Sequence, residues 1–380
     1  MSSPSQGSRI EDYARRLAGG LGVPDFVYEP VLIRRGNSSR EVSDGLLVAG
    51  PDGVIMQVKS RESEAAQDDS IEKAINWSLK NGLAGHRQGT GTRRTLVANT
   101  VRMRSLRGYE RDLPDASSWP VVVIIDHPLG PSAAFEPSPD TLFISSADWL
   151  NLHNMVRSTA GVISYVRRAL SSGISVPLGK EARRYGALAE ADLQAASGLT
   201  SFPTLPYGPL SNQELQDVAL FDDLVERVAD PIGSTGWDPE EYLTIVEQLD
   251  RAPLIARSRI GAKMREKFVE MATTKAIRTF RAFDPSGGKD RLAFLYAYDD
   301  GRYGEDGQQF IAEVACYTAL RQHQALDAGA GTSFATLGIG ILHSTDRGQR
   351  FSFARFPGRP TAFPDDLLRS LEARYGNPHL

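Results

Sequence analysis

The chain has 380 residues, of which 41% are hydrophobic and 24% are charged, with a formal net charge of −4. These are the proportions of an ordinary globular protein long enough for two domains, and the negative charge argues against a general nucleic-acid coating protein. The single cysteine, Cys316, excludes an internal disulfide and a cysteine-based zinc site. Residues 1–7 lack the apolar core of a signal peptide, and no apolar run approaches the ~18 residues of a membrane helix. We therefore expect a cytoplasmic protein that has no membrane partner.

Helices and strands alternate in the first part of the chain. Apolar patterning predicts helices over residues 10–19, 71–83 and 147–170, and strands over residues 26–34, 95–101, 121–125 and 141–145. The second helix opens at Ser70 and is expected to end in the glycine-rich residues 85–91. Strands that alternate with helices in this way imply an α/β sheet with helices on its faces.

A β-hairpin is predicted between the first strand and the second helix. Two short apolar runs, residues 46–49 and 54–58, flank the tetrapeptide Gly50-Pro51-Asp52-Gly53. Because proline presets φ and glycine accepts positive φ, this tetrapeptide is a strong turn signal. The two runs should therefore pair as antiparallel strands, with polar residues at their open end.

The second part of the chain predicts a separate domain. Residues 171–210 are expected to be a linker, because glycine, serine and the prolines Pro203, Pro206 and Pro209 resist helix formation. Residues 211–380 predict an α+β domain whose helices cover residues 212–228, 239–249, 253–273, 308–324 and 364–375, and whose strands cover residues 276–283, 291–298, 334–342 and 351–356. No motif in this domain can be tied to a particular chemistry.

The open end of the hairpin carries the candidate site. Asp44 precedes the first apolar run, and Gln57-Val58-Lys59 ends the second. An acid on one strand and a Gln-x-Lys on the next can hold a divalent metal beside a lysine. Such a metal activates water while the lysine stabilises charge on a phosphate, which is the equipment for hydrolysing a phosphodiester. The dipeptide Pro51-Asp52 lies in the turn, away from this end, and we interpret it as turn chemistry alone.

This arrangement resembles the PD-(D/E)xK nuclease superfamily, which has the restriction-endonuclease-like fold. The pattern of that superfamily is a helix with an acid, a strand with Asp, a strand with (D/E)xK, and a helix. Here Glu11, Asp44, Gln57 and Lys59 follow in the same order. Gln57 replaces the usual acid, as in Mrr-like relatives with Gln-x-Lys. The resemblance implies a restriction-endonuclease-like nuclease domain over residues 1–170, with a central mixed sheet flanked by helices.

The resemblance also implies a role for each site residue. The metal ligands that the resemblance implies for Mg²⁺ or Mn²⁺ are oxygen atoms of Asp44, Gln57 and Val58. A hard cation prefers oxygen ligands of this kind. Lys59 polarises the attacking water or the scissile phosphate, and Glu11 supports the metal or its water. Glu29 and Glu41 flank the hairpin and are alternative third acids.

The pairing register of the hairpin decides whether these side chains meet. With a two-residue turn centred within Pro51-Asp52, the numbers of paired residues sum to 103, as for Asp44 with Lys59, and Gln57 shares their face. A three-residue loop with a glycine bulge makes the sum 104 and moves Asp44 to the opposite face, unless a second bulge restores it. Both registers remain open from the sequence, and the competing interpretation is an ordinary amphipathic hairpin with a snorkelling lysine.

A basic stretch follows the candidate site. Between His86 and Arg111 the only acid is Glu110. The guanidinium fork of arginine suits phosphate oxygens. The residues expected to form a track for the DNA backbone are Arg87, Arg93, Arg94, Arg102, Arg104 and Arg107. The competing interpretation is that arginine is simply the preferred cation of this protein.

Together these features predict a Mg²⁺-dependent DNA endonuclease that acts in defence against foreign DNA. The alternative is a catalytically inactive module that keeps the nuclease fold and binds nucleic acid or a protein partner. A third hypothesis is a structural scaffold in which the C-terminal domain does the work. By analogy with modules attached to restriction-like nucleases, the C-terminal domain is assigned to targeting, sensing or homo-oligomer formation.

Overall fold

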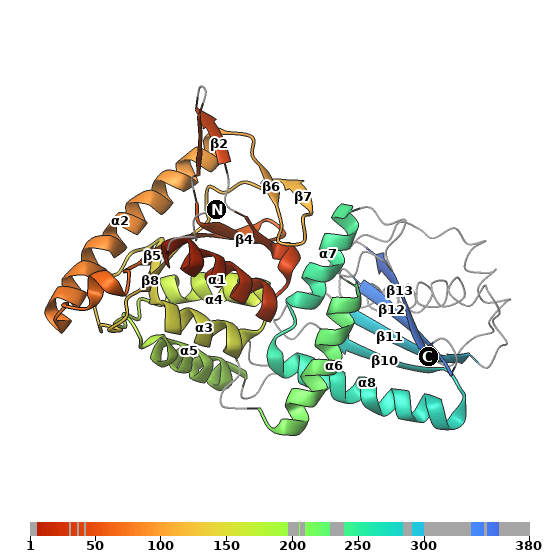
Figure 1. Cartoon of the computed structure of the whole chain (residues 1–380). Coiled ribbons are helices and arrows are strands. Elements are labelled where there is room, and N and C mark those ends of the chain that lie inside the picture. The colour runs from red at the N-terminus through yellow and green to blue at the C-terminus, as the bar shows by residue number, and fades with distance from the viewer. Residues whose placement is uncertain are drawn as a thin grey trace. The chain divides into compact units, whose positions relative to one another are not determined.

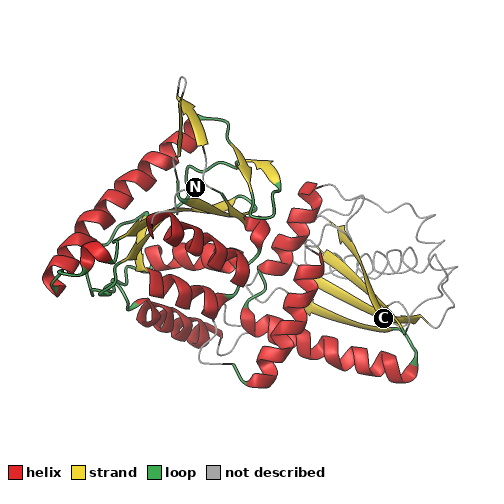
Figure 2. Ribbon diagram, viewed as in Figure 1, coloured by secondary structure: helices red, strands yellow, loops and turns green. Residues whose placement is uncertain are grey.

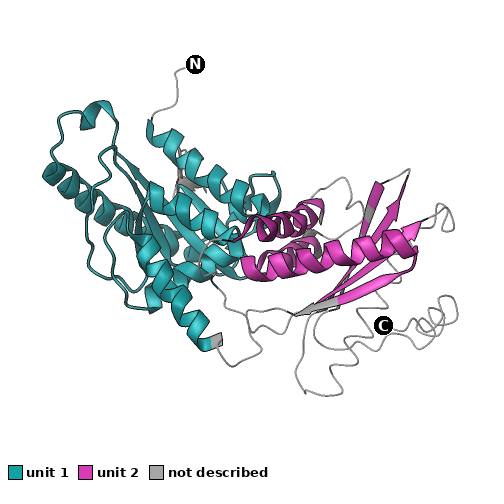
Figure 3. Ribbon diagram, turned by 90° about the horizontal axis from the view of Figure 1, so that it is seen from below, with its two compact units in different colours: residues 1–199, 203–207 teal, residues 200–202, 208–380 magenta. Residues whose placement is uncertain are grey.

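The computed structural model combines helices and β-sheets (Figure 1; Figure 2) in two compact units, residues 1–199 with 203–207 and residues 200–202 with 208–380 (Figure 3). The structure describes residues 6–29, 32–35, 38–41, 43–196, 205, 210–228, 239–283, 291–299, 336–345 and 348–356. The predicted helices over residues 308–324 and 364–375 lie outside the described residues.

Unit 1 is built on a five-stranded mixed sheet with the order β1-β4-β5-β8-β9. Its strands are β1 (Val27–Tyr28), β4 (Gly45–Ala49), β5 (Asp52–Ser60), β8 (Val121–Asp126) and β9 (Thr141–Ser145). The first three strands are antiparallel, whereas β8 is parallel to β5 and β9 is parallel to β8. A central mixed sheet flanked by helices, as expected from the sequence, is confirmed for this unit.

Helices cover both faces of this sheet. On one face lies α2 (Ile71–Ala98), which packs against β5 and β8. On the other lie α1 (Gln6–Leu21), α3 (Ser146–Val156) and α4 (Thr159–Ser171), and α5 (Glu181–Ala196) packs against α3 and α4 (Figure 1). The predicted helix over residues 147–170 is therefore two helices. They are separated at Arg157, whose φ is +48°, and Ser158 caps α4 by accepting a hydrogen bond from the Gly161 N–H at 2.7 Å.

Smaller elements surround the sheet of unit 1. The strand predicted over residues 26–34 is interrupted: a 3₁₀ turn (Pro24–Phe26) precedes β1, and β2 (Leu32–Arg35) pairs with β3 (Ser38–Glu41) in a hairpin of its own. A second small hairpin joins β6 (Arg102–Arg104) and β7 (Glu110–Asp112), and a 3₁₀ turn (Glu64–Ala66) lies between β5 and α2.

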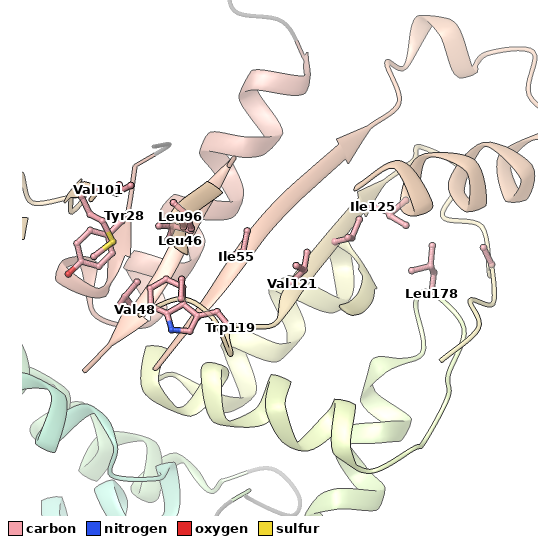
Figure 4. Packing of buried hydrophobic residues seen from close by; sticks show 14 residues of the cluster. Tyr28, Leu46, Val48, Ile55, Leu96, Val101, Trp119, Val121, Ile125 and Leu178 are labelled. Carbon is pink, nitrogen blue, oxygen red and sulfur yellow. The ribbon is translucent and has the colours of Figure 1, made fainter. Parts of the chain in front are cut away.

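The core of unit 1 between the sheet and α2 contains large, fully buried side chains (Figure 4). Leu46 and Val48 of β4 lie beside Ile55 of β5 and Val121 of β8, and Trp119 closes one end. The indole N–H of Trp119 donates to the Pro51 carbonyl at 3.1 Å, so this ring also holds the β4–β5 turn. Burial of each such side chain contributes about 1.5–3 kcal/mol, which fixes the sheet that carries the candidate site.

The prediction of a strand over residues 95–101 is wrong, because α2 continues to Ala98. The helix begins as expected, with the Ser70 hydroxyl accepting from the Lys73 N–H at 3.2 Å. Its glycines do not end it, since Gly85 and Gly89 face the sheet. A Cβ atom at Gly89 would lie 2.3 Å from Cγ1 of Val121. The absence of side chains therefore lets the helix lie close against the strands, and this packing outweighs the low helix propensity of glycine.

The expectation of a linker over residues 171–210 is also wrong in its first half. Residues 181–196 form α5, an alanine-rich helix that belongs to unit 1. Glu181 is buried at its start, where it accepts hydrogen bonds from the Tyr165 hydroxyl at 2.6 Å and from Arg184 at 2.9 Å. The three prolines that suggested an extended segment all come after this helix, so they do not oppose it.

Unit 2 contains three helices and a four-stranded sheet among its described residues. The helices are α6 (Asn212–Val228), α7 (Pro239–Asp250) and α8 (Leu254–Thr274), and the strands are β10 (Arg278–Phe283), β11 (Arg291–Asp299), β12 (Thr336–Ser344) and β13 (Gly348–Phe356). The sheet order is β10-β11-β12-β13, with β11 and β12 parallel and the other pairs antiparallel. These elements lie within a few residues of their predicted positions.

Candidate functional site

The β4–β5 hairpin has a tighter register than either predicted one. Ala49 pairs with Asp52 and Gly45 with Met56, so paired numbers sum to 101 and the loop is Gly50-Pro51. Gly50 has a φ of +58° and occupies the first central position, as a type II′ turn requires. Proline, whose φ is fixed at a negative value, then fits the second position. Asp52, which directly follows this loop, forms an ion pair with Arg167 at 2.6 Å.

This register places Gln57 and Lys59 on one face, because they lie two residues apart on β5. That face is the one covered by α2, because Cε of Lys59 lies 3.4 Å from the position of a Cβ at Gly85. The paired register ends at Gly45 and Met56. Asp44 does not continue it, because its N–H also donates to the Met56 carbonyl, at 3.3 Å, so that two residues of one strand lie opposite one of the other, as in a β-bulge. Gln57 and Lys59 thus extend the apolar row of Leu46 and Ile55 toward the open end.

The Asp44 carboxylate is held against the edge of β5. Its Oδ2 accepts a hydrogen bond from the Val58 N–H at 2.6 Å. Burial raises the pKa of the Asp44 carboxyl above its usual 3.8, while the Val58 bond and the charges of Lys59 and Arg15 oppose this shift. A carboxylate between two cations in a partly dry setting is a candidate functional group on physical grounds.

Gln57 is a buried amide without a partner in the protein. The residue is only 3% exposed, and its side chain makes no hydrogen bond to any residue that the structure describes. Neither polar atom of this amide is among the fully buried, unpaired side-chain atoms of the described residues, so both keep some access to solvent. The Gln57 amide oxygen can therefore act as a ligand for a bound cation.

The main chain of β5 supplies another oxygen at the same place. In a strand, the N–H and C=O of one residue point toward the same neighbour. Because the Val58 N–H points to the Asp44 carboxylate, the Val58 carbonyl also lies on the β4 side of β5. This carbonyl belongs to a part of β5 that extends past the paired end of β4, which stops at Gly45.

From α1, Arg15 reaches the site, and the sequence analysis missed it. A guanidinium N–H of Arg15 donates to the Asp44 carbonyl, and its charge acts on the carboxyl. Glu11 lies one turn earlier on α1 and is half-buried, so its place in the site stays a prediction. Glu29 directly follows β1 and is exposed, and the side chain of Glu41 lies outside the described residues. The only signal for Arg15 was its i+4 spacing from Glu11.

The oxygen atoms at this end suit a hard cation such as Mg²⁺. A carboxylate, an amide oxygen and a backbone carbonyl come from Asp44, Gln57 and Val58. The local charge is less favourable, because Arg15 and Lys59 both act on Asp44, although the Asp12 carboxylate lies 4.0 Å from the Arg15 guanidinium. Mg²⁺ is usually held by one or two carboxylates together with substrate phosphates, so these residues fit a metal that binds with a phosphate. Among the described residues, no three His, Cys, Asp or Glu side chains form a metal-binding group.

The structure divides the six arginines of the expected DNA track. Three are engaged in ion pairs: Arg93 with Asp140, Arg102 with Glu110 at 3.1 Å, and Arg107 with Asp25 at 3.7 Å. Arg93 also donates to the Trp119 carbonyl at 3.0 Å, which makes it a structural residue. Arg104 is exposed on β6, and Arg87 and Arg94 are exposed on α2. The six therefore do not form one continuous surface of free cations.

Unit 2 contains a cavity of about 240 Å³ between α6, α8 and its sheet. Its walls are apolar, with Met264 and Phe268 from α8 and Ile341 from β12. The charged groups at its rim are already engaged: Asp223 pairs with Arg227 at 2.7 Å, and Arg265 pairs with Asp217 at 3.0 Å. The guanidinium of Arg227 also lies 5.2 Å from the centre of the Phe351 ring.

Comparisons of this chain with protein-family models, with curated proteins and with solved structures find no match. None of the described helices is both long enough and apolar enough to cross a membrane. The indications of function are therefore the geometry of the candidate site and the resemblance of its sequence to the PD-(D/E)xK pattern.

Proposed function

We propose that unit 1 is a metal-dependent endonuclease that hydrolyses phosphodiester bonds in DNA and uses Mg²⁺ or Mn²⁺. The observation that carries this proposal is the polar end of the β4–β5 hairpin, where the Asp44 carboxylate accepts from the Val58 N–H and the neighbours of Val58, Gln57 and Lys59, share one face. The order of a helix, an Asp, a Gln-x-Lys strand and a second helix supports the resemblance to PD-(D/E)xK nucleases. A role in defence against foreign DNA would follow from such an activity.

A divalent metal at this place would activate water and stabilise the charge that develops on the phosphate. The chain's own residues hold and orient the reactants. Asp44 is fixed by the Val58 N–H, which leaves its other carboxylate oxygen for a metal. The stem of Lys59 lies beside Gly85, which leaves room for it, and the residue as a whole is half-buried. A cation fixed there favours the transition state over the ground state, because the phosphate gains negative charge during attack.

The test is cleavage of supercoiled plasmid by the full chain with Mg²⁺, with Mn²⁺ and with EDTA. We expect cleavage only with metal. Lys59→Met should abolish it, because methionine keeps the packing of the stem and removes the charge. Lys263→Met is the matched control, since Lys263 lies in unit 2 and pairs with Glu266 at 2.7 Å. Wild-type protein that cleaves nothing with any divalent metal would refute the proposal.

A second candidate function is supported by the charge at the same place. Arg15 and Lys59 bring two cations to Asp44, and cations at such a place can bind a phosphate directly, although the Asp12 carboxylate lies 4.0 Å from the Arg15 guanidinium. In that case the protein is an inactive nuclease-fold module that binds nucleic acid. Asp44→Asn would then strengthen DNA binding in EDTA, because it removes a negative charge beside both cations. The endonuclease proposal expects this substitution to remove metal-dependent cleavage instead.

A further inference from the structure

The helix α2 has an unusual distribution of charge. It contains five lysines and arginines and one acid, Glu72, so its formal charge is +4 (five minus one) in a chain whose net charge is −4. Four of the cations recur every seven residues and are all exposed: Lys73, Lys80, Arg87 and Arg94. We call these four residues the α2 cation row.

The α2 cation row lies on the outside of unit 1. The residues of α2 that face the sheet include Gly85 and Gly89, and Arg87 lies two residues from each, which is about 200° around the helix. Seven residues make nearly two turns, so the row drifts by only ~20° per step. Its ends are about 31 Å apart at 1.5 Å per residue. Figure 1 shows α2 along the outer side of the sheet.

These cations lack the ion pairs that several other helix-surface cations have. Arg16 pairs with Asp12 at 2.7 Å and Lys263 with Glu266 at 2.7 Å, each across one helical turn. Elsewhere among the described helices, exposed cations without an ion pair occur singly, as Arg9 on α1 and Arg183 on α5 do. Within the described residues, no side chain of the α2 cation row makes an ion pair or a hydrogen bond. A row of unpaired like charges repels itself, and a polyanion would relieve that repulsion.

We propose that the α2 cation row binds the phosphate backbone of double-stranded DNA. The row is about 31 Å long, which spans roughly nine base pairs at 3.4 Å per step. A membrane surface fits less well, because a helix that binds a bilayer needs a free apolar face and α2 buries that face against β5 and β8. The large apolar residues that α2 exposes are Ile71, Leu83 and Val97, which are twelve and fourteen residues apart along the helix.

This binding is distinct from the proposed cleavage, because the row points away from the face that carries Gln57 and Lys59. It would hold the protein on DNA of any sequence, since backbone contacts carry no sequence information. Arg93, which the sequence grouped with Arg94, takes no part because it pairs with Asp140.

The test is the salt dependence of binding to a labelled 20-base-pair duplex, measured by anisotropy with the full chain in EDTA. Four phosphate contacts contribute about −3.6 to the slope of log affinity against log salt. This corresponds to a loss of affinity of about 150-fold between 50 and 200 mM salt from the row alone. The variant that changes all four residues to Gln should lose that part of the slope, and Arg87→Gln alone should lose about 0.9 of it.

The matched control also removes two lysines and two arginines, but from ion pairs on other helices or directly after one: Arg16, Arg251, Lys263 and Lys267. We expect its slope to equal that of the wild type. Glutamine is a good helix former, so the helical circular dichroism of both variants should be unchanged. A row variant with the wild-type slope, or a wild type that binds anionic vesicles and not the duplex, would overturn the proposal. Because EDTA prevents cleavage, the result does not depend on the endonuclease proposal, and Asp44→Asn should keep the row-dependent slope.

Discussion

The close packing of α2 on the sheet predicts opposite effects for two alanine substitutions in the same helix. At Gly89 a Cβ would lie 2.3 Å from Cγ1 and 2.9 Å from Cγ2 of Val121. Carbon atoms prefer about 3.5–4.0 Å, and the stiff, β-branched valine on a central strand cannot turn away. Overpacking of this kind costs about 1–3 kcal/mol. At Gly91 nothing lies within 4 Å of the new Cβ.

Replacing a helical glycine with alanine gains about 1 kcal/mol of helix propensity at either position. Gly91→Ala should therefore raise the free energy of unfolding by about 1 kcal/mol, whereas Gly89→Ala should lower it by up to about 2 kcal/mol. The difference between the variants isolates the overpacking, since the propensity cancels. Urea unfolding followed by tryptophan fluorescence reports mainly on unit 1, which contains Trp77, Trp119 and Trp149, three of the four tryptophans of the chain. Equal effects of the two substitutions would refute the packing of α2 described above.

Further predictions concern one buried histidine and two site residues. Both ring nitrogens of His153 are buried without a partner, so His153→Leu should stabilise the protein by about 1–2 kcal/mol at pH 7. Burial also lowers the pKa of His153 from 6.5 to about 3. The free energy of unfolding of the wild type should therefore fall by about 1.4 kcal/mol per pH unit as the pH falls from 6.5 toward 3. Urea unfolding at pH 5 and pH 7 should show that the variant lacks this loss. Gln57→Glu should lower the melting temperature in EDTA, because it adds a negative charge next to Val58, whose N–H binds the Asp44 carboxylate, and it should make Mg²⁺ more stabilising. Scanning fluorimetry in which Mg²⁺ has no larger effect than on the wild type would contradict this. Because burial raises the pKa of Asp44, the acid limb of the profile of kcat/KM against pH should have its midpoint above pH 3.8. Arg15→Gln should move this midpoint to higher pH, because it removes a cation that favours the carboxylate. An unchanged profile would exclude Asp44 as the titrating group.

The elements that the sequence predicted well are those in which side-chain pattern and packing agree. The apolar runs at residues 121–125 and 141–145 and the helices of unit 2 have a clear period and ordinary ends. The pattern failed at α2, where glycine is normally a sign of a helix end. There the glycines are required by contact with Val121 and Val123, and no local rule contains that tertiary information.

The candidate site was predicted in its residues but not in its register. The observed numbers of paired residues sum to 101 rather than 103, and the regular pairing ends at Gly45 and Met56, so that Asp44 reaches β5 through its hydrogen bond to Val58 instead of through the ladder. The shift arose at Gly50, whose positive φ starts the turn one residue earlier than the Pro51-Asp52 pattern suggested. Arg15 was missed because it reaches a backbone carbonyl from a helix on the other face of the sheet.

The central claim is that Asp44, Gln57 and Lys59 form a metal-dependent site for cleaving DNA. The most direct test is the single-turnover rate of cleavage of a labelled duplex with Mg²⁺, for the wild type and for Asp44→Asn. Asparagine keeps an oxygen that can accept from the Val58 N–H and removes the charge, so the fold should survive. We predict that the wild type cleaves with Mg²⁺ and not with EDTA, and that Asp44→Asn is slower by about 100-fold or more. A wild type without cleavage, or cleavage that survives in Asp44→Asn, would contradict the account.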